Sequence, residues 1–296
     1  MANKELAFIC AILLEKNMQI KVNYDIITHG GGDITSNQIM CGDCEDAEIR
    51  YLREMLYEGD HVLDIGGNIG LHTVNFGEKI APTGKMVTFE PMSKNYYVLN
   101  QNIRKYDLDQ NVLAVNAAVS DESKKTQYII NPKNMGDCRG HVFDNEVNKL
   151  DFCNDSPDKD FEEETVNQIT LDDFFNDQNT IEIEWSKITL IKMDTQGSEI
   201  SILKGASNCF KEPFNGTIFM EYAPYWLHNN DQDIGWFFRF IKEQMFSVFM
   251  IPLDSNVGGR PIVNPSSIIE IKNYYEECKM KDTYCNIILK RTPYKS

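Results

Sequence analysis

The sequence predicts an α/β fold built on a doubly wound, mainly parallel sheet. From about residue 61 onward, short apolar runs rich in β-branched and aromatic residues alternate with amphipathic helical stretches. This alternation is typical of a parallel sheet that helices cover on both faces. A chain of 296 residues, 42% of them hydrophobic, is long enough to bury one large core. We therefore expect residues 51–296 to form one domain, on which residues 1–50 pack as an N-terminal extension.

Seven runs are predicted as strands because each is short, apolar and bounded by turn residues. They are His61–Ile65, Met86–Glu90, Val112–Val119, Ile188–Asp194, Thr217–Tyr222, Phe246–Ile251 and Tyr284–Lys290. Helical spacing of apolar residues predicts helices at about 69–79, 93–106, 198–210 and 231–245, and Gly205 is placed to end the third of these early. The last two strands are consecutive, so they can form an antiparallel hairpin at one edge of the sheet.

An insertion at about 120–186 interrupts this alternation. Within it, Gln127–Ile130 and Val166–Leu171 can pair as an extra hairpin. The run Asp151–Glu164 is acidic and polar and shows no hydrophobic period. Such a run predicts a lid, a binding loop or a plain solvated loop.

Charge, cysteine content and hydropathy limit the expected partners and location of the protein. The net charge of −16, from 45 acidic and 29 basic residues, would repel a phosphate backbone, so DNA is not an expected partner. Eight scattered cysteines suit reduced thiols in a cytoplasmic protein, and Cys41 and Cys44 lack the further ligands of a zinc site. The apolar stretch Leu6–Leu14 is too short to span a membrane and precedes no cleavage site.

A glycine-rich turn follows the first predicted strand and opens the first helix. Its motif, D-x-G-x-N-x-G, comprises Asp64, Gly66, Gly67, Asn68 and Gly70. Backbone N–H groups and the positive end of the helix dipole face a ligand bound at such a turn. The dinucleotide pattern G-x-G-x-x-G fails because Ile65 occupies its first glycine position. An acid at the strand end instead suits a ligand that carries ammonium and sulfonium groups.

Two further strand ends favour a nucleoside ligand. Glu90 ends the second strand, where a carboxylate can accept hydrogen bonds from both ribose hydroxyls. Asn116 and Ala117, in the third predicted strand, would lie beside the adenine edge, where small side chains leave room for the ring. Either feature is weak evidence by itself, but together with the turn they predict a nucleoside-containing cofactor.

The fourth and fifth strands carry the candidate catalytic residues. Asp194 is a candidate general base or metal ligand, and Glu199 and Glu221 can join it. Three converging carboxylates would favour assistance by Mg²⁺ or Mn²⁺. Alternatively, Asp194 caps the helix that starts near residue 197 and Glu199 lies in its first turn. Lys192 would neutralise these acids.

Two further features allow more than one interpretation. They are an aromatic group at the end of the fifth strand and a histidine in the first helix. Tyr222, Tyr225 and Trp226 can form a stacking wall for a sugar ring or pack in the core. His72 is interpreted as a structural hydrogen-bonding residue rather than a base.

These motifs together resemble the FkbM family of S-adenosylmethionine-dependent methyltransferases. The matching blocks are Val62–Gly70, Phe89–Pro91 with Asn95, Leu99 and Asn102, Asn116–Ser120, Thr170–Asp172, Lys192–Ala206 and Glu221. They occur in the family's order over roughly residues 40–222. Gly67 stands where alanine is common, and Gln196 stands where glutamate often occurs.

The resemblance implies a Rossmann-like, seven-stranded methyltransferase sheet with an antiparallel last strand. It also implies O-methylation of a hydroxyl on a sugar, polysaccharide or polyketide-type natural product. By position, Asp64, Gly66, Asn68 and Glu90 become contacts to S-adenosylmethionine, and Asp194 with Glu199 becomes the acid set beside the acceptor. A sugar or glycan acceptor is the leading hypothesis. Its alternatives are a small natural product, RNA, a nicotinamide-dependent oxidoreductase and a non-catalytic binding module.

Overall fold

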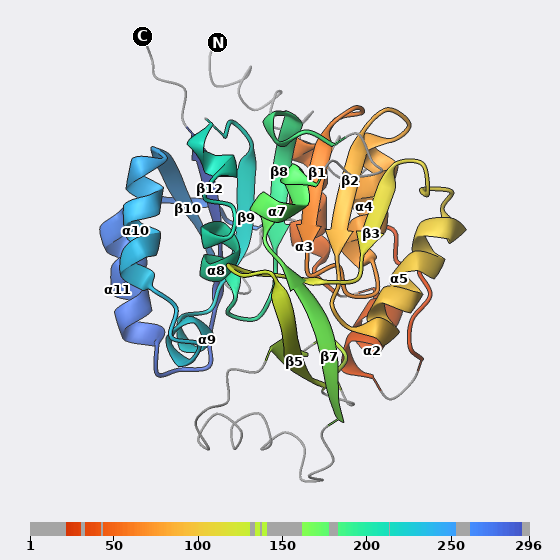
Figure 1. Cartoon of the computed structure of the whole chain (residues 1–296), viewed down its shortest axis with the longest axis horizontal. Helices are drawn as coiled ribbons and strands as arrows, with labels where there is room; N and C mark the ends of the chain where they lie inside the picture. The colour runs from red at the N-terminus through yellow and green to blue at the C-terminus, as the bar shows by residue number, and fades with distance from the viewer. Residues whose placement is uncertain are drawn as a thin grey trace, which may run out of the picture.

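The computed structural model describes residues 22–30, 33–42, 44–130, 134–136, 138–140, 162–177, 183–212, 214–252 and 261–291. An eight-stranded sheet forms the centre of the molecule, in the order β11-β10-β12-β9-β8-β1-β2-β3 (Figure 1). Its strands are β1 (His61–Ile65), β2 (Lys85–Phe89), β3 (Val112–Val115), β8 (Ile188–Met193), β9 (Thr217–Tyr222), β10 (Phe246–Pro252), β11 (Asn264–Ser266) and β12 (Cys285–Arg291). The predicted doubly wound α/β class is confirmed.

The two ends of this sheet differ in strand direction. Strands β3, β2, β1, β8 and β9 are parallel, whereas β12 runs antiparallel to both β9 and β10. The prediction of an antiparallel last strand is therefore confirmed. The predicted antiparallel pairing of the last two predicted strands is also confirmed, because β10 pairs with β12 along its length. The outermost strand at this end is β11, which was not predicted, so the sheet has eight strands rather than the predicted seven. Its Pro265 suits an edge position.

Alternate residues of each strand enter separate apolar cores on the two faces of the sheet, as the two-residue period of a strand requires. Leu63 packs on one face with α7 (Leu171–Asn176), α8 (Glu199–Lys204), α10 (Ile234–Glu243) and α11 (Ile268–Cys278). Val62 packs on the other face with α3 (Asp46–Met55), α4 (Leu71–Ile80) and α5 (Ser93–Lys105). Figure 1 shows α10 and α11 together at one end of the sheet and α5 at the opposite end.

Four of the described helices lie close to the predicted ranges, and five are new. In chain order the helices are α2 (Ile34–Cys41), α3 (Asp46–Met55), α4 (Leu71–Ile80), α5 (Ser93–Lys105), α7 (Leu171–Asn176), α8 (Glu199–Lys204), α9 (Pro224–Asn229), α10 (Ile234–Glu243) and α11 (Ile268–Cys278). Gly205 ends α8 early, as predicted, and the short 3₁₀ helix Cys209–Lys211 follows. Helices α2, α3, α7, α9 and α11 were not predicted.

The predicted third strand is divided between two sheets. After β3 the chain turns at Asn116, and β4 (Ala118–Val119) joins a second sheet with the order β4-β7-β5-β6. There β5 (Lys124–Ile130) pairs antiparallel with β7 (Glu162–Ile169), and β6 (Arg139–Gly140) pairs with β5. The predicted extra hairpin is therefore confirmed. Strand β7 begins inside the run predicted as a loop, 151–164, and residues 151–161 lie outside the described part.

The described N-terminal residues lie against the sheet domain. Val22, Ile26 and Ile39 share an apolar cluster with residues of α4 and α5. The side-chain amide of Asn102 donates hydrogen bonds to the carbonyl groups of Ile27 and Ile69. Residues 6–14 lie outside the described part. No helix among the described residues is long and apolar enough to cross a membrane.

Candidate active site

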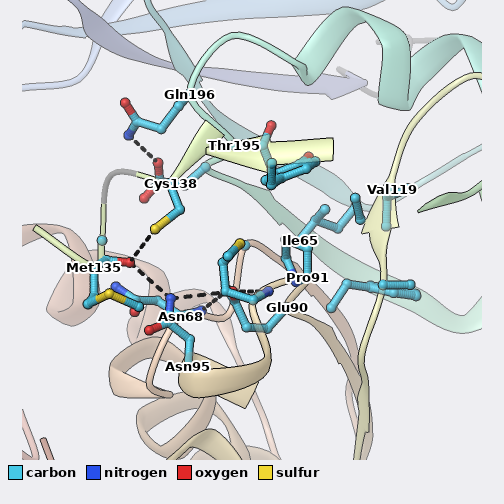
Figure 2. A pocket seen from close by; sticks show the side chains of 18 residues that line it. Ile65, Asn68, Glu90, Pro91, Asn95, Val119, Met135, Cys138, Thr195 and Gln196 are labelled. Carbon is cyan, nitrogen blue, oxygen red and sulfur yellow. Dashed lines mark hydrogen bonds between the residues drawn. The ribbon is translucent and has the colours of Figure 1, made fainter. Parts of the chain in front are cut away.

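The carboxyl ends of β1, β2 and β8 meet at one edge of the main sheet, because these three strands are parallel neighbours. Gly66, Glu90 and Asp194 directly follow them. All three line a cavity of about 620 Å³, which we call the inner cavity (Figure 2). Ligands of open α/β sheets bind at this position.

The glycine-rich turn forms one wall of the inner cavity. Gly66 has a φ angle of +86°, and a Cβ atom there would lie 2.0 Å from the Asp194 carbonyl oxygen. The N–H groups of Gly66 and Gly67 both donate to the Phe89 carbonyl oxygen, at 3.0 and 2.9 Å. A Cβ atom at Gly70 would lie 2.9 Å from the Leu99 side chain of α5. A side chain at Gly66 would therefore clash with the chain after β8, and one at Gly70 would clash with α5, so both positions of the turn require glycine.

Glu90 is held by backbone donors on both carboxylate oxygens. Its Oε2 accepts from the Asn68 N–H at 2.8 Å, and its Oε1 accepts from the Met92 N–H at 2.9 Å. The Asn95 amide lies 3.4 Å from Oε1. Burial raises the pKa of Glu90 to about 7, although these donors favour the ionised form. The result is a fixed carboxylate in the cavity wall, drawn beside Asn68 and Asn95 in Figure 2.

Asp64 lies behind this wall rather than in it. It is fully buried, and its Oδ2 accepts from the Thr73 hydroxyl at 2.7 Å. Its Oδ1 lies 3.4 Å from the Lys192 Nζ, which also donates to the Gly66 carbonyl oxygen at 3.0 Å. The described lining of the inner cavity does not include Asp64. The structure therefore gives Asp64 a role in fixing the turn through Lys192.

Asn116 and Ala117 lie on the side of the inner cavity formed by β3. The Asn116 side-chain amide donates to the carbonyl groups of Glu90 and Pro91, both at 2.9 Å. It fixes the loop after β2, whereas Ala117 lines the cavity. Sequence reasoning did not find Tyr128 and Met135, which also line it, because neither belongs to a strand-end motif.

Asp194 is exposed to two cavities. Its side chain lines the inner cavity and a wider, open cavity of about 2100 Å³, which we call the outer cavity. Burial raises the pKa of Asp194, but Lys192, whose Nζ lies 3.7 Å from Oδ2, and hydrogen bonds with Glu221 and Gln196 together outweigh this effect, so the pKa is lowered. The Gln196 amide lies 3.4 Å from Asp194 Oδ1 and donates to Glu221 at 3.2 Å. Asp194, Gln196 and Glu221 therefore form one polar group between the cavities.

Glu199 does not join this group. It is fully buried, and its Oε1 accepts from the N–H and the hydroxyl of Thr195, both at 2.9 Å. The expected convergence of Asp194, Glu199 and Glu221 on one metal ion is therefore wrong. In the described part of the chain, no three His, Cys, Asp or Glu side chains are grouped closely enough to hold a metal. Ser198, not Asp194, is the N-cap of α8.

The outer cavity contains acidic residues that sequence reasoning missed. Glu45 and Glu48, at the start of α3, line it together with Asp194 and Glu221. The Asn286 amide of β12 donates to Glu48. No local motif points to these glutamates, because they reach the site only through the packing of α3 beside the sheet.

His72 and the aromatic residues Tyr222, Tyr225 and Trp226 lie in different parts of the structure. His72 Nδ1 lies 3.3 Å from Glu45 Oε2, and burial lowers the His72 pKa to about 3, so the ring is neutral. This fits the predicted hydrogen-bonding role. Tyr222 is fully buried in the main core, so its place in a sugar-binding wall is excluded. Trp226 lines the outer cavity and packs edge-to-face with Tyr225 at a centroid distance of 5.0 Å.

The sheet order, the turn after β1 and the buried carboxylate after β2 define a nucleoside-binding α/β enzyme. The family described as the methyltransferase FkbM domain matches residues 64–246, more than half of the chain. The chain belongs to this family of S-adenosylmethionine-dependent methyltransferases.

Several solved structures are similar to this chain. The methyltransferase FkbM from Methylobacillus flagellatus KT is 14% identical and has a TM-score of 0.40 over 79% of this chain and 44% of that one. The present chain thus spans less than half of that protein. An O-methyltransferase from Bacillus cereus, in complex with SAH, is 12% identical and has a TM-score of 0.42, with 94% and 90% covered. A comparison with curated proteins gives no match.

Proposed function

We propose that the chain transfers a methyl group from S-adenosylmethionine to a hydroxyl group of a sugar or glycan. The observation that carries this proposal is the position of Asp194, whose side chain lines both the inner and the outer cavity. A cofactor in the inner cavity and an acceptor in the outer cavity would meet beside this carboxylate.

The inner cavity fits the cofactor. The Glu90 carboxylate is rigidly held in its wall and is available to accept hydrogen bonds from the two ribose hydroxyls. Pro91, Ala117 and Val119 offer small apolar surfaces for the adenine ring. Gly66 has no side chain to block the amino acid part of the cofactor, and Asp64 contributes through Lys192.

Asp194 would orient the acceptor and receive its proton. When bound, the cofactor supplies an electrophilic methyl group for in-line displacement. The attacking hydroxyl becomes acidic only as its oxygen forms the new bond, so a carboxylate with a low pKa is a sufficient acceptor for the proton. Lys192 is a positioning residue that keeps Asp194 ionised.

Two observations support a carbohydrate acceptor. Trp226 gives the outer cavity a flat apolar surface, and Gln38, Asn134 and Asn286 give it polar groups. The carboxylates of the same cavity disfavour the RNA alternative, because they would repel phosphates. Cys41, Cys44, Cys209, Cys278 and Cys285 form no disulfide bond, which supports the cytoplasmic location that we propose.

Transfer of a labelled methyl group to a panel of sugars and glycans tests this function. We expect a product with at least one carbohydrate acceptor and equal rates with Mg²⁺, Mn²⁺ or a chelator. Calorimetry should show binding of S-adenosylhomocysteine and none of NAD. Binding of NAD in its place would contradict the assignment.

A further inference from the structure

The outer cavity has a wall that the family match does not cover. The match spans residues 64–246, whereas Glu45 and Glu48 precede it and Asn286 follows it. Helix α3 and strand β12 bring these residues together, because Asn286 donates a hydrogen bond to Glu48. This wall is therefore formed by parts of the chain that lie outside the family match.

The carboxylates of this wall have no cation of their own. Among the described residues that line the outer cavity, Lys192 is the only lysine or arginine. Its ammonium group already contacts Asp64, Asp194 and the Gly66 carbonyl oxygen. Asp46, on the same helix, has its own partner, since Arg50 lies 2.6 Å from it.

Glu45 and Glu48 differ from Asp46 in their partners. Glu45 faces His72, which is neutral, and Glu48 faces the neutral amide of Asn286. Burial, with repulsion from Asp194, raises the pKa of Glu45 to about 7. Burial, with repulsion from Glu45, raises the pKa of Glu48 to about 8. Carboxylates held together without a cation are electrostatically unfavourable, so a positively charged ligand would relieve this repulsion.

Two buried hydrogen-bond acceptors beside this wall, His72 Nε2 and Asn68 Oδ1, have no donor among the described residues. The carboxylate of Glu45 only accepts hydrogen bonds when ionised, so His72 Nδ1 carries the proton and His72 Nε2 is an acceptor. That Nε2 atom is buried and has no hydrogen-bond partner, although the side chain lines the outer cavity and is only 8% exposed. Asn68 Oδ1 is likewise a buried acceptor without a partner. An ammonium group would supply a positive charge to Glu45 and Glu48 and a hydrogen-bond donor to these acceptors.

We propose that the acceptor carries a protonated amine, as an amino sugar does, and that its ammonium group binds between Glu45 and Glu48 while its hydroxyl lies at Asp194. This inference rests on the proposed function. Glu45 and Glu48 are then specificity-determining residues, because they select the acceptor without contacting the cofactor.

Oligosaccharides that differ in one substituent test the inference. Short chitosan, chitin and cellulose oligosaccharides of equal length carry an amine, an acetamide or a hydroxyl at the same ring position. With protein saturated by S-adenosylmethionine, we expect kcat/KM for the amine to exceed that for the other two by about tenfold or more, the effect of one partly buried ion pair. E45Q and E48Q should each remove most of this preference. E58Q, at an exposed glutamate outside both cavities, should keep it.

The outcomes separate the inference from the proposed function. Unchanged binding of S-adenosylhomocysteine by E45Q and E48Q shows that both variants are folded. Methyl transfer without preference for the amine, or with none of the three sugars accepted, overturns the inference, and the first result leaves the proposed function standing. A magnesium requirement that E48Q abolishes also overturns it, because the carboxylates would then bind a metal. Failure of the wild type to bind S-adenosylhomocysteine overturns both.

Discussion

The inner and outer cavities lie side by side but differ in how their charges are satisfied. In the inner cavity, both oxygens of Glu90 accept backbone hydrogen bonds, and Asp64 behind the wall faces Lys192. In the outer cavity, Glu45 and Glu48 contact only neutral side chains among the described residues. The protein thus satisfies the charges of the inner cavity by itself, and we propose that a cationic acceptor satisfies those of the outer cavity.

This difference arises because the two cavities are formed by different segments of the chain. The inner cavity is formed by turns that directly follow β1, β2 and β8, so the fold itself fixes their geometry. The outer cavity needs α3 and β12, which are distant in sequence from those turns. One fold can therefore keep a cofactor and change its acceptor by altering these peripheral elements.

The largest effect is expected from removal of the internal cation. Lys192→Met would leave Asp64 and Asp194 beside each other without compensation. We expect a loss of about 3–5 kcal/mol in the free energy of unfolding, measured by urea denaturation, as for other broken buried ion pairs. Lys187→Met, at an exposed lysine, is the control. Stability within about 1 kcal/mol of the wild type would show that the inner cavity does not depend on this charge balance.

Asp194→Asn keeps the shape of the residue that both cavities share but weakens its capacity to accept a proton. We expect kcat to fall by about 10²-fold or more, with cofactor affinity nearly unchanged. Asp121→Asn, at an exposed site, should have no effect on turnover. Full activity of Asp194→Asn with a confirmed acceptor would remove Asp194 from the mechanism.

Glu90→Gln tests whether the hydrogen-bonded carboxylate of Glu90 contributes to cofactor binding. The amide can accept from only one of the two backbone N–H groups and would oppose the other with its own N–H. Because a hydrogen bond to a charged group contributes about 1.5–3 kcal/mol, we expect the affinity for S-adenosylhomocysteine to fall about 10- to 100-fold. Calorimetry provides the measurement. Equal affinity would contradict the assignment of Glu90 to the ribose.

The smallest effect is a pH dependence of the unliganded protein. The pKa of Glu48 is raised to about 8 in the folded state, so the folded protein binds this proton more tightly than the unfolded chain does. The resulting stability is fully present below the unfolded pKa and is lost as pH rises through about 8. Glu48→Gln should be more stable than the wild type by about 1 kcal/mol at pH 8.5 and equal to it at acidic pH. Parallel pH curves for both proteins would exclude a raised pKa.

The main sheet was predictable where burial dominates. The ranges of β1 and β9 match the predicted strands because every residue in them is buried on a two-faced sheet. The run Val112–Val119 could not be divided from its sequence, since the break depends on Asn116 bonding to the loop after β2. Helix α11 was missed because its capping box, Ser267 with Glu270, lies in a connection rich in turn residues.

The site was predictable where it follows strand ends. Gly66, Glu90 and Asp194 lie in the cavity wall as the doubly wound pattern predicts. Glu199 was misplaced because the sequence does not show that its carboxylate turns back to the Thr195 N–H. Glu45 and Glu48 were missed because only tertiary packing brings α3 to the strand ends.

The most direct test of the two-cavity account is a crystal structure of the protein with S-adenosylhomocysteine. The account expects both ribose hydroxyls within hydrogen-bond distance of the Glu90 carboxylate, with the sulfur atom facing Asp194 at the boundary of the outer cavity. A ligand bound outside the inner cavity, or one whose sulfur faces away from Asp194, would contradict it.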